Sequence, residues 1–243
     1  MEVNPLSKNL GAEIKGKDVG ELDIHIQKES AHSNHPEVQI LSNKKVDGQF
    51  VGSPSAGDNW HSDLSYTEIS TLCTMLYALE VPFQGGDTEW ANMYKAYDGL
   101  PEKYKLKIKG LHARHTFNRF RNPRVEVPDV YKGKGKERYI DVAPPDAIHP
   151  IVRTHPETGR KTLYVSERFT IGIKELDEKE GKDLLDVLFE HQKKTEFIYH
   201  HRWDLHDLTI WDNRCLIHLA CGGVPEGQIR YMHRTIVRGD RPY

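Results

Sequence analysis

The chain has 243 residues, a length that suits one sizeable core, and we expect a single domain spanning residues 1–243. Its 34 Lys and Arg nearly balance its 36 Asp and Glu, and the formal net charge of -2 gives no overall attraction to nucleic acid or to a membrane surface. The three cysteines form neither an even set nor a CxxC pair, and no run of roughly 20 apolar residues could span a bilayer, so we expect a cytoplasmic protein without a disulfide framework.

Short strands separated by turn residues dominate the predicted structure. Each candidate strand is rich in β-branched or aromatic residues and is bounded by Gly, Pro, Asn or Asp. These strands are residues 38–41, 71–79, 163–165, 196–203, 208–211 and 231–237. Helices are predicted at 90–98, at 101–109, where a proline opens the first turn, and at 175–194, where leucines repeat at helical spacing. This pattern indicates a barrel or sandwich that is mainly β, with flanking helices.

A long segment at residues 122–148 contains Pro, Gly, Lys and Arg without any periodicity. It predicts a surface loop, and loops of this length are typical of active-site lids or of disordered segments. Both interpretations remain open.

Histidine is frequent, with 14 residues in 243, and this prompts a search for metal ligands. His61 and Asp63 stand two residues apart in an extended segment, so their side chains would project to the same side and could reach one ion. Alone, the pattern is weak, because an Asp that binds local backbone in a turn would look the same.

His218 lies far downstream, among polar groups next to strand-like segments. Together with His61 and Asp63 it would supply two histidines and one carboxylate, the ligand set that leaves three positions open on iron(II). A catalytic zinc ion also uses three protein ligands, so the set alone does not exclude a hydrolase.

Arg230 and Arg234 are four residues apart in a predicted strand, where they would share one face about 13 Å apart. A guanidinium is suited to binding a carboxylate or sulfonate through two hydrogen bonds. Two such groups beside a metal pocket favour an acidic cosubstrate and an acidic substrate, although a solvated cationic strand face is the alternative.

Five blocks of sequence resemble the taurine dioxygenase and 2,4-dichlorophenoxyacetate dioxygenase group of 2-oxoglutarate-dependent oxygenases. They follow the order of that family and nearly its spacing, and together they are far more specific than any one of them. The blocks are NWHSD (59–63), GGDTEW (85–90), HPIVRTHP (149–156), WDNR (211–214) and RYMHR (230–234).

The resemblance implies roles for individual residues. His61, Asp63 and His218 are implied to bind iron(II), and Thr88 and Arg230 to bind the distal carboxylate of 2-oxoglutarate. A hydroxyl and a guanidinium suit that task, because they satisfy a carboxylate that is otherwise costly to bury. Arg234 matches the position that binds the anionic group of the prime substrate in the sulfonate-acting members.

Several other polar residues are interpreted as structural. Residues 211–214 are expected to pack and to form a turn near His218. His155 is expected at the surface in a hairpin turn, and no role is assigned to Cys215 or Cys221. Likewise, sheet-face or loop positions are expected for His200, His201 and His206.

The N-terminal part departs from the family pattern. Residues 10–14 resemble its opening strand, but residues 20–22 resemble a segment that normally comes several dozen residues later. Either the protein has lost the helix and strand between them, or the sequence omits residues near Val19 and Gly20. We favour the second explanation, because loss of a core strand should severely destabilise a barrel.

The substrate pocket also departs from the pattern, which puts taurine in doubt. Gly57 stands where a sulfonate-acting relative has an amide side chain. If Phe117, Phe120 and Phe169 line the pocket with Arg234, they favour a larger apolar body with one anionic group, such as a carboxylate, a sulfate ester or a larger sulfonate.

The resemblance implies a double-stranded β-helix, or jelly roll, and an iron(II)- and 2-oxoglutarate-dependent dioxygenase. Such an enzyme uses molecular oxygen, hydroxylates a small anionic organic substrate and releases succinate and carbon dioxide. A non-catalytic metal-binding barrel protein and a zinc hydrolase on a cupin-like barrel are the alternatives. No nucleic-acid or membrane partner is expected, and a homo-oligomer is left open.

Overall fold

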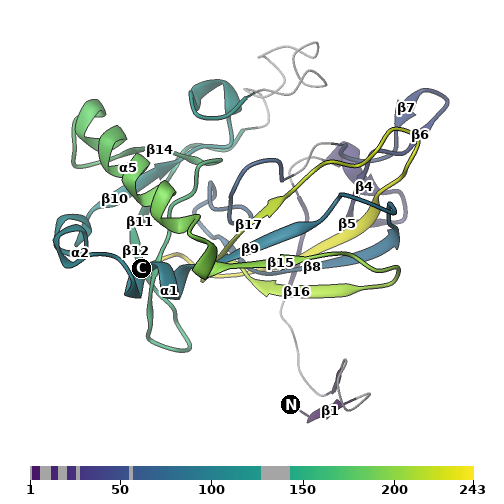
Figure 1. Ribbon diagram of the computed structural model, residues 1–243, viewed down its shortest axis with the longest axis horizontal. Coiled ribbons are helices and arrows are strands. Elements are labelled where there is room, and N and C mark those ends of the chain that lie inside the picture. Colours follow the sequence, from purple (N-terminus) through teal and green to yellow (C-terminus); the bar gives the residue numbers. More distant parts are fainter. Residues whose placement is uncertain (1, 6–11, 16–20, 26–27, 55–56, 127–142) are drawn as a thin grey trace.

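The structure is a computed structural model that describes residues 2–5, 12–15, 21–25, 28–54, 57–126 and 143–243. These residues form a mainly β structure with a few helices. Figure 1 shows the helices at one end of the molecule and the longest strands at the other. No helix among the described residues is long and apolar enough to cross a membrane.

The largest sheet has six strands and carries several residues of the candidate site. Its strands run in the order β16, β8, β18, β5 and β4, and β3 also pairs with β18. The bounds are β3 (Leu22–Asp23), β4 (Ala31–His32), β5 (His35–Ser42), β8 (Thr71–Glu80), β16 (Leu208–Asp212) and β18 (Tyr231–Arg238).

A three-stranded sheet, in the order β15, β9 and β17, packs against the larger sheet. Its strands are β9 (Thr88–Asn92), β15 (Ile198–His201) and β17 (Leu216–Ala220). Buried apolar side chains from β9, β5, β8, β16 and β18 form one cluster, which includes Trp90, Leu41, Leu76, Trp211 and Met232. Burial of this cluster holds the two sheets together, since removing apolar surface from water stabilises the fold.

The other sheets and the helices surround a second core. A sheet of β11 (Ala147–Pro150), β10 (His112–His115) and β14 (Thr170–Ile173) lies beside helices α1 (Met93–Asp98), α2 (Glu102–Ile108) and α5 (Glu178–Gln192). The remaining pairs are β1 (Glu2–Pro5) with β2 (Ala12–Lys15), β6 (Lys45–Val46) with β7 (Gln49–Phe50), and β12 (Val152–Thr154) with β13 (Lys161–Leu163). Single 3-10 turns occupy Lys28–Ser30, Arg119–Arg121 and Thr195–Phe197.

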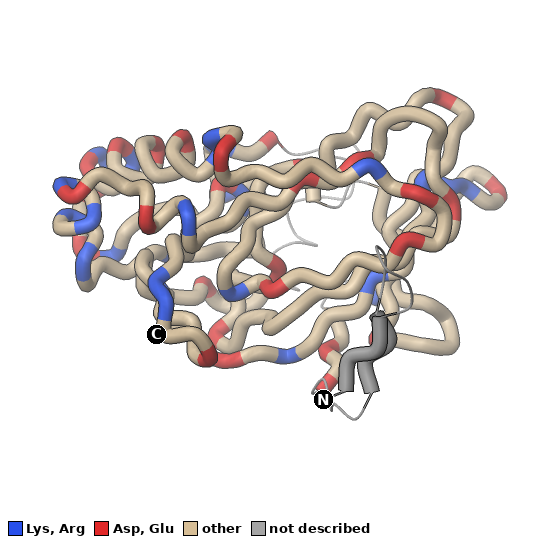
Figure 2. The backbone as a smooth tube through the Cα atoms, turned by 60° about the horizontal axis from the view of Figure 1, so that its bottom comes forward, with Lys and Arg blue, Asp and Glu red and all other residues tan. Residues whose placement is uncertain are grey.

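Helix α5 illustrates how the sequence sets an element. Asp177 begins it, with a side chain that accepts a hydrogen bond from the backbone N–H of Glu180. Leu184, Leu185 and Leu188 are fully buried on one face. Figure 2 shows Lys and Arg interspersed with Asp and Glu along the described chain, so no single sign of charge dominates.

Most predicted elements are confirmed with small shifts of their ends. The strands expected at 38–41, 71–79, 208–211 and 231–237 correspond to β5, β8, β16 and β18, and the helices expected at 101–109 and 175–194 correspond to α2 and α5.

Three element predictions need correction. The helix expected at 90–98 starts only at Met93, because β9 extends through Asn92 and is paired on both edges; Asn92 then caps α1. The strand expected at 163–165 ends at Leu163. The strand expected at 196–203 begins with a 3-10 turn, and only Ile198–His201 is extended.

Two predictions fall wholly or partly outside the described residues. The junction at Val19 and Gly20 is one, and the central part of the 122–148 loop, residues 127–142, is the other. Within the described part of that loop, β11 already begins at Ala147.

Candidate active site

His61 and His218 face each other across an isolated antiparallel bridge. The His61 N–H donates to the His218 carbonyl at 3.0 Å, and the His218 N–H donates to the His61 carbonyl at 2.7 Å. Residues opposite one another in such a pair project their side chains to the same side. The two rings accordingly lie with their centroids 4.1 Å apart.

Asp63 completes a compact group of possible metal ligands. His61 Nε2 lies 3.6 Å from Asp63 Oδ1, and His218 Nε2 lies 3.9 Å from Asp63 Oδ2. All three residues are buried, and one ligand atom from each lies within 4.8 Å of the others. The structure thus brings together residues that are 155 positions apart in the sequence.

The histidines present their Nε2 atoms in a form that can bind a metal. His61 Nδ1 lies 2.8 Å from the carbonyl of Asn59, and only a protonated Nδ1 can donate there, which leaves the Nε2 lone pair free. Burial, and then His61, lower the pKa of His218 well below its ordinary value. His218 is therefore neutral at physiological pH, as ligation requires.

The Asp63 carboxylate is kept ionised despite its burial. Burial raises the pKa of Asp63, but Arg234 and the two histidines lower it by more, and the net pKa lies well below the ordinary value. Arg234 Nη1 donates to Asp63 Oδ1 at 3.0 Å, and the Thr74 hydroxyl donates to Oδ2 at 2.6 Å. An anionic oxygen ligand therefore stands beside the two imidazoles.

Arg234 lies within the buried site rather than on a solvated strand face. It belongs to β18, between Gln39 on β5 and Leu76 on β8, and it also donates to the Gln39 side-chain oxygen. His25 lies nearby, and burial followed by Arg234 lowers its pKa to about 3. Arg234 thus places a positive charge directly beside the candidate metal ligands.

An aromatic wall on one side of the site consists of Phe169, Tyr66, Phe117 and Phe120. The Phe169 ring lies 5.7 Å from the His61 ring, and Tyr66 contacts both Phe169 and Phe117. Phe120 packs against the same cluster, and so does Ile236 of β18. The three phenylalanines named from the sequence therefore gather in one place.

Gly57 lies against this site as well. Its φ of 81° favours glycine, and a side chain there would approach His61 Cε1 to 3.3 Å and Ala220 Cβ to 3.4 Å. Glycine therefore leaves room beside a candidate metal ligand.

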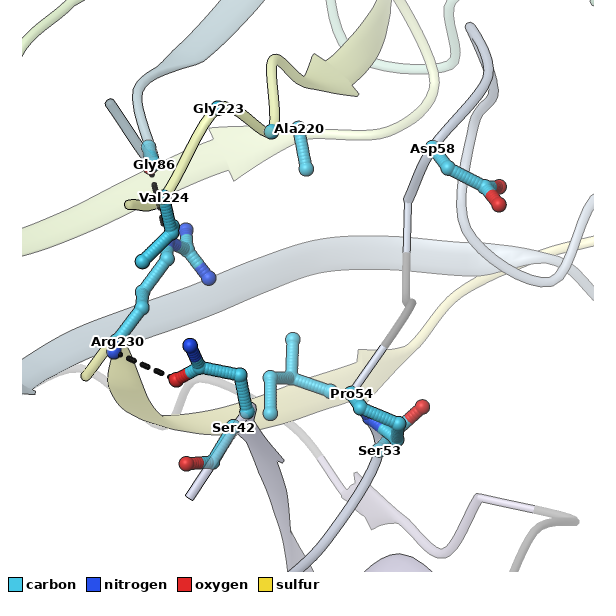
Figure 3. Close-up of a pocket in the computed structure, with 12 residues that line it drawn as sticks. Ser42, Ser53, Pro54, Asp58, Gly86, Ala220, Gly223, Val224 and Arg230 are labelled. Atoms are coloured by element: carbon cyan, nitrogen blue, oxygen red, sulfur yellow. Dashed lines mark hydrogen bonds between the residues drawn. The ribbon is translucent and has the colours of Figure 1, made fainter. Parts of the chain in front are cut away.

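A separate cavity of about 310 Å³ opens beside Arg230 (Figure 3). Arg230 Nε donates to the Gly86 carbonyl at 2.8 Å, and its backbone N–H donates to Asn43 Oδ1 at 2.9 Å. A side chain at Gly86 would collide with Arg230 Cδ at 2.9 Å, so glycine permits this position. Ala220 also lines the cavity, and it shares a face of β17 with His218.

The environment of Arg230 favours a bound anion. Its surroundings lower its pKa to about 10, with burial as the largest cause. The guanidinium remains charged at neutral pH, and a carboxylate in the cavity would compensate the cost of burying that charge. The volume is in the range of small-molecule sites.

Thr88 is connected to Arg230 through Trp203. The Trp203 indole N–H donates to Thr88 Oγ1 at 3.0 Å, and the Arg230 guanidinium lies 5.8 Å from the Trp203 ring centre. Because Thr88 Oγ1 accepts this bond, its own proton is available for another acceptor. Thr88 is buried and does not line the Arg230 cavity itself.

The structure does not place Arg230 and Arg234 on one regular strand, as the sequence had suggested. Arg230 precedes the first residue of β18, and the pairing of β18 with β8 shifts between Tyr231 and Met232. The regular alternation used to place Arg230 and Arg234 on one strand face is therefore interrupted between them.

Two further groups of possible ligands lie outside this site among the described residues. Glu89, His200 and Cys221 form one, but both His200 ring nitrogens already contact carboxylates, at 2.8 Å from Asp87 and 3.0 Å from Glu89. The other comprises His155, Asp212 and Cys215, where Arg214 engages Asp212. The three cysteines are free.

The surface position predicted for His155 is wrong. Its side chain is buried, and its Nε2 lies 3.0 Å from Asp212 Oδ2. The turn residues around it are exposed, but the ring points inward to an acidic partner that is distant in sequence. His200, by contrast, is exposed on β15, and His206 lies in a loop, as predicted.

The sequence interpretation assigned no role at the site to three polar residues that contact it, two from strands and one from a turn. Thr74 and Gln39 each bind a charged site residue, and Asn213 binds the Asp63 backbone N–H at 3.0 Å. Nothing local distinguishes a threonine or glutamine in a strand from an ordinary sheet residue. The polar WDNR block, which includes Asn213, was the only usable signal.

Comparisons with known proteins show which proteins this chain resembles. The sequence profile of the family described as taurine catabolism dioxygenase TauD, TfdA family matches residues 5–236. The alpha-ketoglutarate-dependent 2,4-dichlorophenoxyacetate dioxygenase of Cupriavidus pinatubonensis (strain JMP 134 / LMG 1197) is 34% identical over 202 residues, which cover 80% of this chain and 68% of the relative.

Solved structures show the same relationship. A taurine dioxygenase from Burkholderia xenovorans superposes with a TM-score of 0.71 at 29% identity, covering 92% of this chain and 69% of that one. The structure of AAD-2 in complex with Mn(II) and N-oxalylglycine superposes with a TM-score of 0.69 at 33% identity, covering 84% and 75% respectively.

Proposed function

Since the chain belongs to the taurine catabolism dioxygenase TauD, TfdA family, we propose that His61, Asp63 and His218 hold iron(II) for the hydroxylation of a small anionic substrate. The chain is a 2-oxoglutarate-dependent dioxygenase, so its cosubstrates are 2-oxoglutarate, also called alpha-ketoglutarate, and molecular oxygen. The observation that carries the iron proposal is the convergence of three buried ligand atoms from His61, Asp63 and His218.

The donor set fits iron(II). Two imidazoles and one carboxylate leave three positions for other ligands, whereas a structural zinc site would need a fourth protein ligand. When bound, iron(II) supplies oxygen activation, coupled to conversion of 2-oxoglutarate to succinate and carbon dioxide. The protein holds the ligands in place, keeps His218 neutral and Asp63 ionised, and excludes water with the aromatic wall around Phe169.

Arg230 and Thr88 bind the distal carboxylate of 2-oxoglutarate in this proposal. Arg230 offers a charged donor in a cavity next to the face of β17 that carries His218. Thr88, which does not line this cavity, is connected to Arg230 through Trp203 and retains a hydroxyl proton. Such charge-assisted bonds would orient the cosubstrate so that its other end lies at the metal site.

The prime substrate is a carboxylate, sulfonate or sulfate ester with an apolar body. Arg234 supplies the positive charge, while Phe169 and Phe120, together with Phe117, supply apolar surface. Relatives named for 2,4-dichlorophenoxyacetate and for taurine act on anions of these kinds. Gly57 leaves space in the site, and the phenylalanine side chains supply apolar surface. Both features favour larger acids that carry an aryl group.

The two sheets that enclose the site form a double-stranded β-helix in this proposal, within one catalytic domain. Their face-to-face packing through Trp90, Trp211 and Met232 supports that arrangement. The non-catalytic barrel and the zinc hydrolase are not retained, since the chain is a member of a dioxygenase family.

Replacing Arg234 with Met should weaken use of an anionic prime substrate by about 10- to 100-fold in kcat/KM, because one charge-assisted hydrogen bond contributes about 1.5–3 kcal/mol. Metal affinity should not fall, since the lost guanidinium competes with the metal for Asp63 Oδ1. Steady-state kinetics with 2,4-dichlorophenoxyacetate, alongside a metal titration, measures both effects. Unchanged kcat/KM would remove Arg234 from the substrate site, and lost metal binding would show that it acts through Asp63.

A screen for succinate release tests the proposal as a whole. The purified protein is supplied with iron(II), oxygen and 2-oxoglutarate, and aryloxy acids, sulfonates and sulfate esters are compared with neutral amides of the same shape. Succinate release that depends on an anionic compound is the expected result. Release stimulated equally by the neutral amides would contradict the assigned substrate class.

A further inference from the structure

The Asp63 carboxylate is held in a closed ring of hydrogen bonds with Thr74 and Asn213. The Asp63 N–H donates to Asn213 Oδ1 at 3.0 Å, Asn213 Nδ2 lies 2.8 Å from Thr74 Oγ1, and Thr74 Oγ1 lies 2.6 Å from Asp63 Oδ2. All three residues are buried, and Thr74 has no exposed surface.

The direction of every bond in this ring is fixed by chemistry. The Asp63 backbone N–H and the Trp211 indole N–H can only donate, and both face the same side-chain atom of Asn213, at 3.0 Å and 3.2 Å. That atom is therefore the amide oxygen, and the NH2 group must donate to Thr74. With this bond accepted, the Thr74 hydroxyl proton points to Asp63 Oδ2.

The two oxygens of Asp63 are consequently not equivalent. If Thr74 left Oδ2, a fully buried hydroxyl would lose its acceptor, which is costly. Arg234, which binds Oδ1, has several donors and a second partner in Gln39. Oδ1 can therefore exchange its hydrogen bond to Arg234 for a metal, whereas Oδ2 keeps its hydrogen bond to Thr74.

We propose that Thr74 is a positioning residue. Its hydroxyl keeps a hydrogen bond to Asp63 Oδ2, so that Asp63 can bind the metal through Oδ1 alone. This inference rests on the metal site of the proposed function. A carboxylate that bound through both oxygens would occupy one of the three positions that the ligand set leaves open. When iron(II) is bound, 2-oxoglutarate and oxygen would need those open positions, so a carboxylate that binds through one oxygen would leave room for both.

Thr74→Val removes the hydroxyl while keeping the shape, and Thr74→Ser keeps the hydroxyl. Co(II) titrations followed by visible absorption report metal affinity and coordination independently of turnover. Thr74→Val should bind Co(II) about 10- to 100-fold more weakly, as is common when a group that orients a metal ligand is lost. It should also bind 2-oxoglutarate more weakly in the Co(II) form and show a changed Co(II) spectrum, while Thr74→Ser stays close to wild type in all three.

Thr71→Val is the matched control, because Thr71 is a buried threonine of the same strand whose hydroxyl has no partner among the described residues. Co(II) binding in Thr71→Val should equal wild type. The inference is overturned if Thr74→Val matches wild type, or if Thr74→Ser is impaired as strongly as Thr74→Val. Should His61→Ala bind Co(II) as wild type does, the proposed metal site fails, and this inference fails with it.

Discussion

His61→Ala and Asp63→Ala are each expected to abolish bound iron(II) and reduce succinate formation to background. Each substitution removes one of the three proposed protein ligands. The two that remain no longer supply two histidines and one carboxylate, and they are too few to hold iron(II). Asp63→Ala also leaves Arg234 without its buried carboxylate partner, so its folding should be checked by thermal denaturation. Iron content after desalting and succinate yield are the measurements.

His200→Ala is the control for this pair. His200 belongs to another group of possible ligands, with Glu89 and Cys221, on an exposed part of the molecule. Its loss should leave iron content and turnover unchanged. If His200→Ala lost iron while His61→Ala retained it, the metal would have been assigned to the wrong group.

Arg230→Gln is expected to raise the 2-oxoglutarate concentration for half-maximal activity by about 10- to 100-fold or more, because at least one charge-assisted bond of about 1.5–3 kcal/mol is lost. Gln keeps an amide donor for the Gly86 carbonyl but no longer carries the charge that the cavity presents. The requirement for the prime substrate should change little, since Arg234 contacts Asp63 in a different part of the site.

Arg238→Gln provides the same substitution at an exposed end of β18. Steady-state kinetics of both variants, with each substrate varied in turn, separates the two sites. An equal rise in both substrate requirements for Arg230→Gln would show that it does not bind the cosubstrate specifically.

The grouping of the three candidate metal ligands was easier to predict from the sequence than the residues around them. His61 and Asp63 form a local pattern, whereas His218 could be added only as a distant histidine that completes a known ligand set and matches the family, since the bridge between positions 61 and 218 is a long-range contact. Thr74 and Gln39 act through tertiary contacts across strands, and no local signal reveals such contacts.

The wrong predictions have related causes. Apolar spacing in a short segment does not separate strand from helix, so Trp90 was assigned to a helix although its strand is paired on both edges. His155 directly precedes turn residues, yet its partner Asp212 is supplied by a distant strand. The lid predicted within 122–148 remains a prediction for residues 127–142, which lie outside the described ranges.

Anaerobic addition of 2-oxoglutarate to the iron(II) protein tests the central claim most directly. A keto acid that chelates iron(II) held by two histidines and one carboxylate gives a weak visible charge-transfer band. We expect the band in the wild type at equimolar 2-oxoglutarate and its absence in Asp63→Ala. A wild type without the band, or an Asp63→Ala variant that retains both the band and turnover, would contradict the assignment of this site.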